Sequence, residues 1–293
     1  MTFRRAWLVS LTTLTLVALW SCSSDDSTNQ LTNSGSQNGA NDGDRSSSNE
    51  GPTSGDSSTT NEGGNTNPND GGADSSDSGK GNDSGPQAGC TGAKVCDDFE
   101  SYAKGGLPTS PWTTQVASAS MAIDDSKAYD GTKSVHITTN GGGAMAVMVQ
   151  EAPLLPMSGN NVYGRFMMFY NVMPTTHYHL VILNGPGDNG QMTMGGLENS
   201  KALFNFGPGD NTAVSNAKYP QGKWACIQWQ FDGPNKTAVM SIDGVQLENK
   251  VTNWQAFDIA KLSVGLLNCC DDGPKVDMWL DAIAIDDAAV ACP

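Results

Sequence analysis

Residues 224–247 read WACIQWQFDGPNKTAVMSIDGVQL, and this stretch decides the fold class. Its first half alternates apolar and polar side chains, so that Ile227, Trp229 and Phe231 lie on one side of an extended chain. Asp243-Gly244 then separates two short apolar runs, and this dipeptide suits a type I′ turn, which needs positive φ at both central residues. The stretch therefore predicts neighbouring antiparallel strands joined by tight turns.

Short runs of the same kind continue through residues 89–293, separated by Gly, Pro, Asn and Asp. No stretch in this part of the sequence shows a convincing amphipathic helix. So many strands in about two hundred residues predict a single all-β domain, a sandwich or jelly roll. The expected strands span residues 96–101, 134–139, 144–150, 162–172, 177–183, 191–194, 202–206, 224–231, 237–242, 261–267 and 276–285.

A hydrophobic leader precedes this domain. Arg4 and Arg5 stand before an apolar run over residues 6–19, which is short for a membrane span. The run ends in Leu19-Trp20-Ser21-Cys22, which resembles a bacterial lipobox; an ordinary cleaved signal or a chance cysteine are the alternatives. Residues 1–22 are therefore predicted to be a lipoprotein signal peptide with Cys22 lipidated. Ser23, rather than Asp, after the cysteine favours the outer membrane or cell surface of a bacterial envelope.

Residues 23–88 form a different kind of segment, rich in Ser, Gly, Asn and Asp and without any aromatic residue. Such a composition buries too little apolar surface to offset the entropy of ordering, so a disordered linker is expected. Its eleven acidic residues, against Arg45 and Lys80, make the linker self-repelling.

The whole chain carries a net charge of −15, and residues 89–293 are acidic as well. An acidic domain without a basic patch argues against nucleic acid and anionic membrane surfaces as partners. We therefore expect a monomer that binds no nucleic acid and touches the membrane only through the Cys22 lipid anchor.

Six cysteines remain once Cys22 is set aside, and an even number in an exported domain favours disulfides. Cys269 and Cys270 are adjacent in the sequence and are therefore expected to pair with different cysteines. We also expect one bridge from Cys90 or Cys96 to Cys292. A zinc site, the alternative, lacks a Cys-x-x-Cys spacing and nearby histidines. The six are Cys90, Cys96, Cys226, Cys269, Cys270 and Cys292.

Several expected strands carry a second face that is neither apolar nor simply charged. Planar amides pair with sugar hydroxyls and aromatic rings stack on sugar faces, so such a face is typical of a carbohydrate-binding groove. Its members are Tyr163, Arg165, His177, His179, Gln191, Asn205, Trp224, Gln228 and Gln230.

Three of these side chains could carry chemistry. Arg165 is the only arginine of residues 89–293 and stands mid-strand among apolar neighbours, where it either lines a solvated cleft or pairs with a structural carboxylate. His177 and His179 share one face of their strand, which suits a metal, a general base or satisfied surface histidines. The sequence shows no clear third ligand beside them, which disfavours zinc. No Glu-x-Asp pair occurs on a candidate groove strand, which disfavours glycoside hydrolysis.

Seven short motifs, taken in order, resemble the secreted cellulose-induced protein family. The resemblance covers residues 96–293 and implies a concanavalin A-like jelly roll related to glucuronan and alginate lyases. The motifs are Asp97-Asp98-Phe99-Glu100, Ala128-Tyr129-Asp130-Gly131-Thr132-Lys133-Ser134, Tyr163-Gly164-Arg165, Thr176-His177, Phe231-Asp232-Gly233-Pro234, Ile242-Asp243-Gly244 and Trp279-Leu280-Asp281.

The resemblance also implies a structural Ca²⁺ ion that joins the first strand, a nearby turn and the last strand. The matching positions are Glu100, the turn from Asp130 to Lys133 through its backbone carbonyls, and Asp281. Hard oxygen ligands from three separated segments suit calcium. Turn and strand-end acids that bind no metal are the alternative.

For a lyase, the resemblance implies β-elimination on a uronate polymer, which needs a neutraliser for the carboxylate, a base and an acid. Residues 261–267 lack the tyrosine and lysine that those enzymes carry at the equivalent positions. The expected catalytic residues are Arg165 as neutraliser with Gln191 or Asn205, His177 or His179 as base, and Tyr163 as acid.

Three hypotheses for function follow. The first is a polysaccharide lyase that cleaves a uronate-containing polymer. The second is a non-catalytic carbohydrate-binding lipoprotein, whose substrate-binding residues are Asn205, Trp224, Gln228 and Gln230. The third is a structural or adhesive surface protein.

Overall fold

The computed structural model describes residues 92–207, 211–255, 257–269 and 275–293. The predicted signal peptide with Cys22, the predicted linker and Cys90 lie outside the described residues. Among the residues described, no helix is long and apolar enough to cross a membrane.

Nine strands form one antiparallel sheet. Its main order is β13-β12-β11-β6-β16-β4-β3; β1 pairs with β16 and β14 with β12. The strands are β1 (Val95–Asp97), β3 (Ala119–Asp124), β4 (Ser134–Thr139), β6 (Asn161–Val172), β11 (Trp224–Asp232), β12 (Thr237–Ile242), β13 (Val245–Gln246), β14 (Val251–Thr252) and β16 (Asp277–Asp286).

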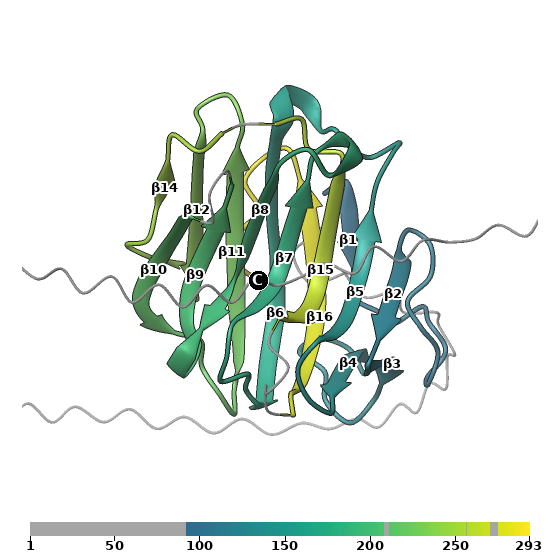
Figure 1. Ribbon diagram of the computed structural model, residues 1–293. Coiled ribbons are helices and arrows are strands. Elements are labelled where there is room, and N and C mark those ends of the chain that lie inside the picture. Colours follow the sequence, from purple (N-terminus) through teal and green to yellow (C-terminus); the bar gives the residue numbers. More distant parts are fainter. Residues whose placement is uncertain (1–91, 208–210, 256, 270–274) are drawn as a thin grey trace, which may run out of the picture. The chain divides into compact units, whose positions relative to one another are not determined.

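Seven strands form the second antiparallel sheet, in the order β10-β9-β8-β7-β15-β5-β2, which lies in front of the nine-stranded sheet in Figure 1. Three short 3-10 turns, η1 (Ser158–Asn160), η2 (Pro186–Asp188) and η3 (Glu198–Ser200), connect strands. The strands are β2 (Thr113–Ala117), β5 (Ala144–Gln150), β7 (Tyr178–Asn184), β8 (Gln191–Leu197), β9 (Lys201–Phe206), β10 (Asn211–Lys218) and β15 (Lys261–Asn268).

The hydrophobic core lies between the two sheets, and alternation decides which side chains enter it. On β11, Ile227, Trp229 and Phe231 belong to the core, as the sequence predicted. On β6, Phe166 and Met168 do the same. The all-β sandwich expected from the sequence is therefore confirmed.

Four strands were not predicted, namely β2, β3, β10 and the two-residue β14. Two of them, β2 and β10, lie at the edges of their sheet and expose most of their side chains, so they lack the apolar alternation that marks a half-buried strand. The first predicted strand was also too long. β1 ends at Asp97, and Phe99 takes a positive φ of 62° that an extended strand does not allow.

A β-bulge interrupts β7 where it pairs with β8, and β15 has an irregularity of its own opposite the same part of β7. The register shifts between His179 and Val181, so Val181 and Leu183 face the core while Ile182 lies outside it. Strict alternation along β7 would have placed Ile182 in the core. Because a bulge re-aims the neighbouring side chains, it sets where His179 points on the outer face.

The prediction that Cys292 pairs with Cys90 or Cys96 is wrong. Cys292 pairs with Cys226 of β11, with a sequence separation of 66 residues. Cys96 is also disulfide-bonded, and its partner lies outside the described residues. The Cys226–Cys292 bridge fixes the C-terminal segment over the outer face of the nine-stranded sheet, where Met167, Cys226 and Ala282 form a second small apolar cluster.

Candidate functional site

The structure divides the predicted site residues between two opposite faces. Since outward side chains of one sheet point away from those of the other, the prediction that Arg165 shares a groove with His177 and His179 is wrong. The nine-stranded sheet carries Tyr163, Arg165, Trp224, Gln228 and Gln230, whereas β7 to β9 and the residue before β7 carry His177, His179, Gln191 and Asn205.

Arg165 is a buried residue of the nine-stranded sheet. Its side chain has an exposed fraction of 0%. Its Nη1 donates a hydrogen bond of 2.6 Å to the backbone oxygen of Ala282, which has φ of 46° where the β16–β6 register shifts. Burial lowers the pKa of the guanidinium. Because it is buried, Arg165 is not in a position to neutralise the carboxylate of a bound polymer.

The amides of the nine-stranded sheet bond within the protein. Gln228 Nε2 donates to the backbone oxygen of Val290 at 2.8 Å, and Gln230 Nε2 donates to the Tyr163 hydroxyl at 2.8 Å. The cavity they line measures only about 200 Å³. Trp224 packs edge-on against Phe169. The Gln228 and Gln230 amides of this face are therefore already hydrogen-bonded within the protein and are poorly placed to bind a sugar.

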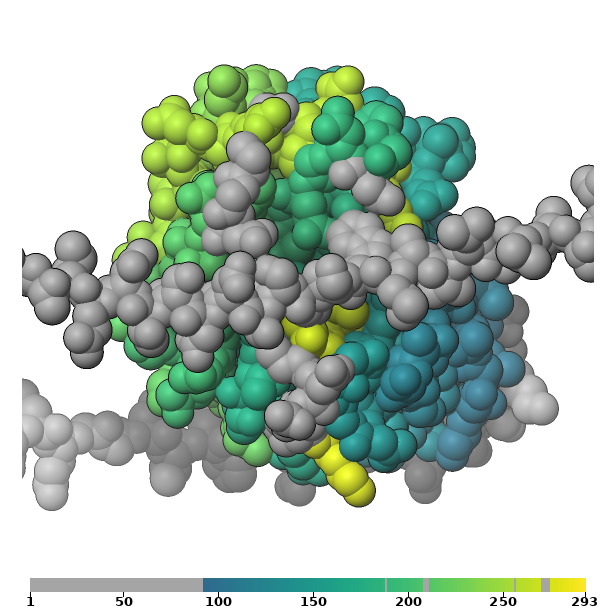
Figure 2. All heavy atoms as spheres, viewed as in Figure 1, coloured from purple at the N-terminus to yellow at the C-terminus, as the bar shows by residue number. Residues whose placement is uncertain are grey.

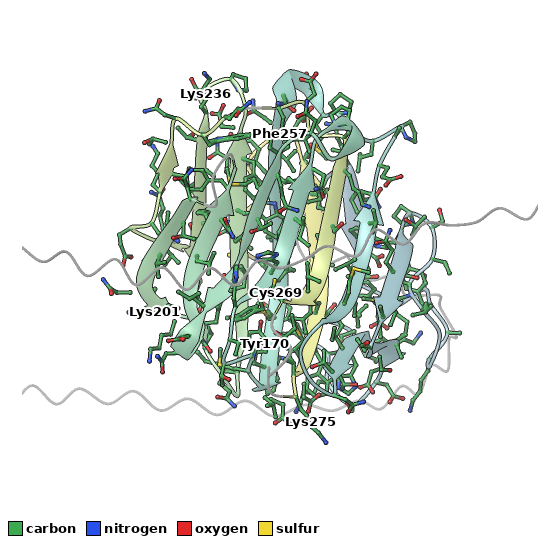
Figure 3. The ribbon with its side chains drawn as sticks, viewed as in Figure 1. Tyr170, Lys201, Lys236, Phe257, Cys269 and Lys275 are labelled. Atoms are coloured by element: carbon green, nitrogen blue, oxygen red, sulfur yellow. A yellow bond between two sulfur atoms is a disulfide. The ribbon has the colours of Figure 1, made fainter. Side chains whose placement is uncertain are left out.

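A larger pocket lies at the end of the seven-stranded sheet where β7 turns into β8. Its volume is about 550 Å³. Figure 3 labels Phe257 at this end of the sheet. Gln191 is the only predicted site residue in it; Phe257 and Gln255 were missed, although residues 253–258 combine amides with aromatic rings. The lining residues are Pro186, Asn189, Gly190, Gln191, Gly207, Gln255, Phe257 and Asp258.

Neighbouring residues hold the Phe257 ring in place. It packs edge-on against Trp254 with ring centroids 5.3 Å apart. A Cβ at Gly190, whose φ is 101°, would lie 2.4 Å from the ring, so only glycine permits this close approach. The half-buried ring can therefore serve as a fixed wall of the pocket.

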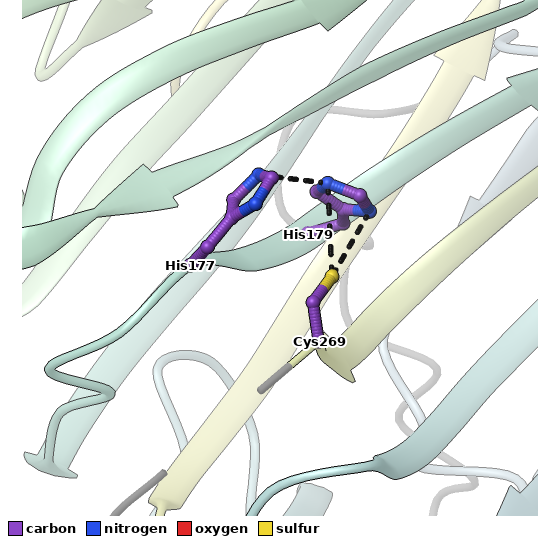
Figure 4. Close-up of side chains that lie close together, drawn as sticks. All are labelled: His177, His179 and Cys269. Atoms are coloured by element: carbon purple, nitrogen blue, oxygen red, sulfur yellow. Dashed lines mark hydrogen bonds between the residues drawn. The ribbon is translucent and has the colours of Figure 1, made fainter. Parts of the chain in front are cut away.

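His177 and His179 meet a third side chain, Cys269, where β7 and β15 lie side by side (Figure 4). The Nε2 atoms of the two histidines are 3.0 Å apart, and Cys269 Sγ lies 3.8 Å from Nδ1 of His179. The backbone N–H of Cys269 donates to the oxygen of His177 at 3.1 Å. No local pattern indicates this contact, because 90 residues separate Cys269 from His179 in the sequence.

Both histidines are held in the neutral form. Burial lowers the pKa of His179 to about 3, with a smaller contribution from His177. Burial also lowers the pKa of His177. A neutral imidazole can bind a metal ion, but a pKa of about 3 makes His179 a weak base at neutral pH, so the general base assigned to this pair stays a prediction.

Gln191 and Asn205 share the outer face of the seven-stranded sheet with His179. Gln191 pairs with Asn184, and Asn184 pairs with Lys261 of β15, so these three form one row across the sheet. Asn205 pairs with Thr193 on the row nearer to His179. The structure thus brings together four of the predicted residues on this face and leaves the other five on the opposite one.

The residues predicted to bind calcium also come together, but as a hydrogen-bonded clasp. Glu100 Oε1 accepts hydrogen bonds from the backbone N–H groups of Thr132 and Lys133, at 2.7 and 2.6 Å. Asp281 Oδ2 accepts from the N–H groups of Tyr129 and Asp130, at 2.7 and 3.2 Å. The turn therefore presents N–H donors, not carbonyl oxygens, to both carboxylates.

Lys133 supplies a positive charge to the same clasp. Its Nζ donates to the backbone oxygens of Glu100 and Tyr102, at 2.7 and 2.9 Å. Burial raises the pKa of Asp281 to about 7, against the opposing effect of its backbone hydrogen bonds. Calcium requires six to eight oxygen ligands, so this arrangement of N–H donors and an ammonium group does not fit it.

Replacement of Lys133 by methionine should lower the free energy of unfolding by about 1–3 kcal/mol, because two part-buried carbonyls lose a charged donor. In protein first freed of transition metals, the melting temperature of the wild type should be the same with and without the calcium chelator EGTA. A fall in melting temperature with EGTA that added calcium restores would show instead that an ion holds the clasp.

The two antiparallel sheets form an all-β jelly-roll sandwich of the concanavalin A-like class. The solved structure of the cellulose-induced protein Cip1 matches this chain with a TM-score of 0.56 and 17% sequence identity, over 68% of this chain and 100% of that one. An endo-β-1,4-glucuronan lyase from the fungus Trichoderma reesei matches with a TM-score of 0.47 and 12% identity, over 66% and 95% of the two chains. Neither a protein-family model nor a curated protein matches the sequence. At such identities the likeness establishes the fold alone.

Proposed function

We propose that the protein binds a uronate-containing polysaccharide on the outer face of its seven-stranded sheet. The observation that carries this proposal is the pocket of about 550 Å³ beside β8, where amides and an aromatic ring converge. A ligand pocket of this size with a few polar groups at an apolar wall is typical of a small-molecule or sugar subsite. Figure 2 is viewed from the same side as Figure 1, in which the seven-stranded sheet lies in front.

The polar groups of the pocket match the chemistry of a sugar. Asn189 and Gln255 are exposed, and Gln191 is half-buried, so their amides can both donate to and accept from hydroxyl groups. Phe257 offers a fixed ring face beside them.

Lysines on the same face suit an acidic sugar. Lys261 begins β15 in the row of Gln191 and Asn184, and it forms an ion pair of 3.8 Å with the largely exposed Glu151. Lys201 begins β9 on the same outer face, at the end of the sheet away from Gln191. A uronate carboxylate bound near Gln191 therefore finds a cation within the same row, and its binding should weaken as salt is added.

Affinity measurements on variants test the location of the site. Phe257→Leu and Gln191→Ala should each weaken binding of glucuronan or alginate oligosaccharides about five- to twentyfold, corresponding to ~1–2 kcal/mol. Gln230→Ala removes an amide from the opposite face and serves as the matched control, with affinity unchanged within about twofold. Calorimetric titration of each purified variant, after its melting temperature is checked, gives the values. Equal losses from all three variants would contradict the proposed site.

Binding without cleavage is the form of the proposal that the geometry supports. β-Elimination needs a neutraliser and an acid near the base. The bases predicted from the sequence are His177 and His179, but Arg165 and Tyr163 lie on the other sheet. Incubation with glucuronan or alginate should therefore produce no unsaturated sugar; a rise in its ultraviolet absorbance would establish a lyase instead.

We further propose that Cys22 anchors the chain in a bacterial envelope and that the segment after it acts as a tether. This rests on the lipobox-like sequence and the composition of residues 23–88. Cys22→Ser should abolish fatty-acid labelling and shift the protein from the membrane fraction to the soluble fraction. Retention of Cys22→Ser in the membrane fraction would show that another feature holds it there.

A further inference from the structure

We propose that His177, His179 and Cys269 bind one transition-metal ion of the zinc type. The three side chains come from the adjacent ends of β7 and β15 and meet on the outer face of the seven-stranded sheet (Figure 4). This site is separate from the sugar pocket, because none of the three residues lines that pocket.

The spacing of the donor atoms fits a single ion. One ligand atom from each residue lies within 4.8 Å of the other two. With Nε2 as the donor atom of His179, this atom lies 3.0 Å from Nε2 of His177 and 3.9 Å from Sγ of Cys269. Ligands at about 2.0–2.3 Å from a tetrahedral zinc ion lie roughly 3.3–3.6 Å apart, so small side-chain rotations suffice.

The donor set selects the class of metal. Two imidazoles and a thiolate suit zinc or copper, whereas calcium and magnesium require oxygen ligands. Three protein ligands also leave a coordination position for water or a substrate atom, as in catalytic zinc sites. Metal binding would release the Cys269 thiol proton, which makes proton release a second readout.

The backbone fixes the three residues before any ion binds. The hydrogen bond from Cys269 N–H to the His177 oxygen joins the two strand ends. Gly195 lies directly beside His179, where a Cβ would approach the Tyr178 oxygen to 1.9 Å and the His179 Cα to 2.7 Å. The bulge after His179 adds to this fixed geometry. A site preorganised in this way loses little entropy when the ion binds.

Metal titration of the untagged full-length protein, freed of metal with a chelator, tests the proposal. Zinc should bind with one ion per chain in calorimetry, and cobalt should produce a thiolate-to-metal absorption band in the near ultraviolet. Cys269→Ser should abolish the band and weaken zinc binding at least tenfold, and His177→Ala should weaken it to a similar degree. His136→Gln, which removes the histidine paired with Asp277 on the other sheet, is the matched control and should bind zinc like the wild type.

Circular dichroism and melting curves establish that each variant is folded before titration. Should Cys269→Ser fail to fold, His177→Ala carries the same test, because His177 lies outside β7 and is only partly buried. No cobalt–thiolate band in the folded wild-type protein, or equal zinc affinity in the wild type and a folded ligand variant, would overturn the proposal.

Discussion

Arg165→Ala should lower the free energy of unfolding by about 3–5 kcal/mol, the largest single-residue effect that we expect in this domain. The side chain is fully buried, so its removal leaves a cavity under the C-terminal segment. The Ala282 oxygen also loses a donor at 2.6 Å. Urea denaturation followed by tryptophan fluorescence measures the change.

The control for Arg165→Ala is Lys250→Ala, which removes one positive charge from an exposed position and should change stability by less than about 0.5 kcal/mol. Below its melting temperature, the Arg165→Ala variant should bind uronate oligosaccharides with wild-type affinity. Near-normal stability combined with lost binding would instead make Arg165 a ligand-binding residue and contradict the structure.

Loss of the Cys226–Cys292 disulfide should lower the free energy of unfolding by roughly 4 kcal/mol, since the bridge closes a loop of 66 residues in the unfolded chain. Cys292→Ser also frees the segment whose Val290 oxygen accepts from Gln228. Cys226→Ser and Cys292→Ser should therefore have similar effects, and the double variant should add little to either.

A double variant with twice the loss of either single variant would show that the two cysteines act separately. Measurement under reducing conditions is the further check. Dithiothreitol should destabilise the wild type strongly. The double variant should lose much less stability, because only the Cys96 disulfide remains in it to be reduced.

Local sequence pattern predicted the fold well because alternation is a local property. The core residues of β11 and β6 follow from period-two spacing alone. The Asp243-Gly244 turn follows from its need for positive φ, and both residues have it, at 50° and 77°. Edge strands such as β2 and β10 were not predicted, because they contribute few side chains to the core and so lack the apolar alternation.

The composition of the site was harder to predict because it depends on which strands belong to the same sheet. The alternation of apolar and polar residues looks the same on β6 and on β7. These two strands follow each other in the chain, but they lie in different sheets. Arg165 and His177 were therefore assigned to one face. Pairing between β7 and β15, which brings Cys269 to His177, is a long-range contact that no local pattern encodes.

Loops and bulges account for the remaining differences. Phe257 enters the pocket from a loop, where no periodicity indicates the direction of a side chain. The bulge in β7 shifts the phase of alternation after His179, and Gly265 on the facing strand has φ of 148°. Residues 261–267 contain this glycine, but a single glycine in a strand does not reveal the register.

Mapping of a bound uronate oligosaccharide by ¹H–¹⁵N NMR tests the central claim most directly. The account predicts that the largest shift changes fall on the backbone amides of Asn189, Gln191 and Phe257, around the pocket of the seven-stranded sheet. Shift changes confined to Gln228, Gln230 and their neighbours on the nine-stranded sheet would contradict it.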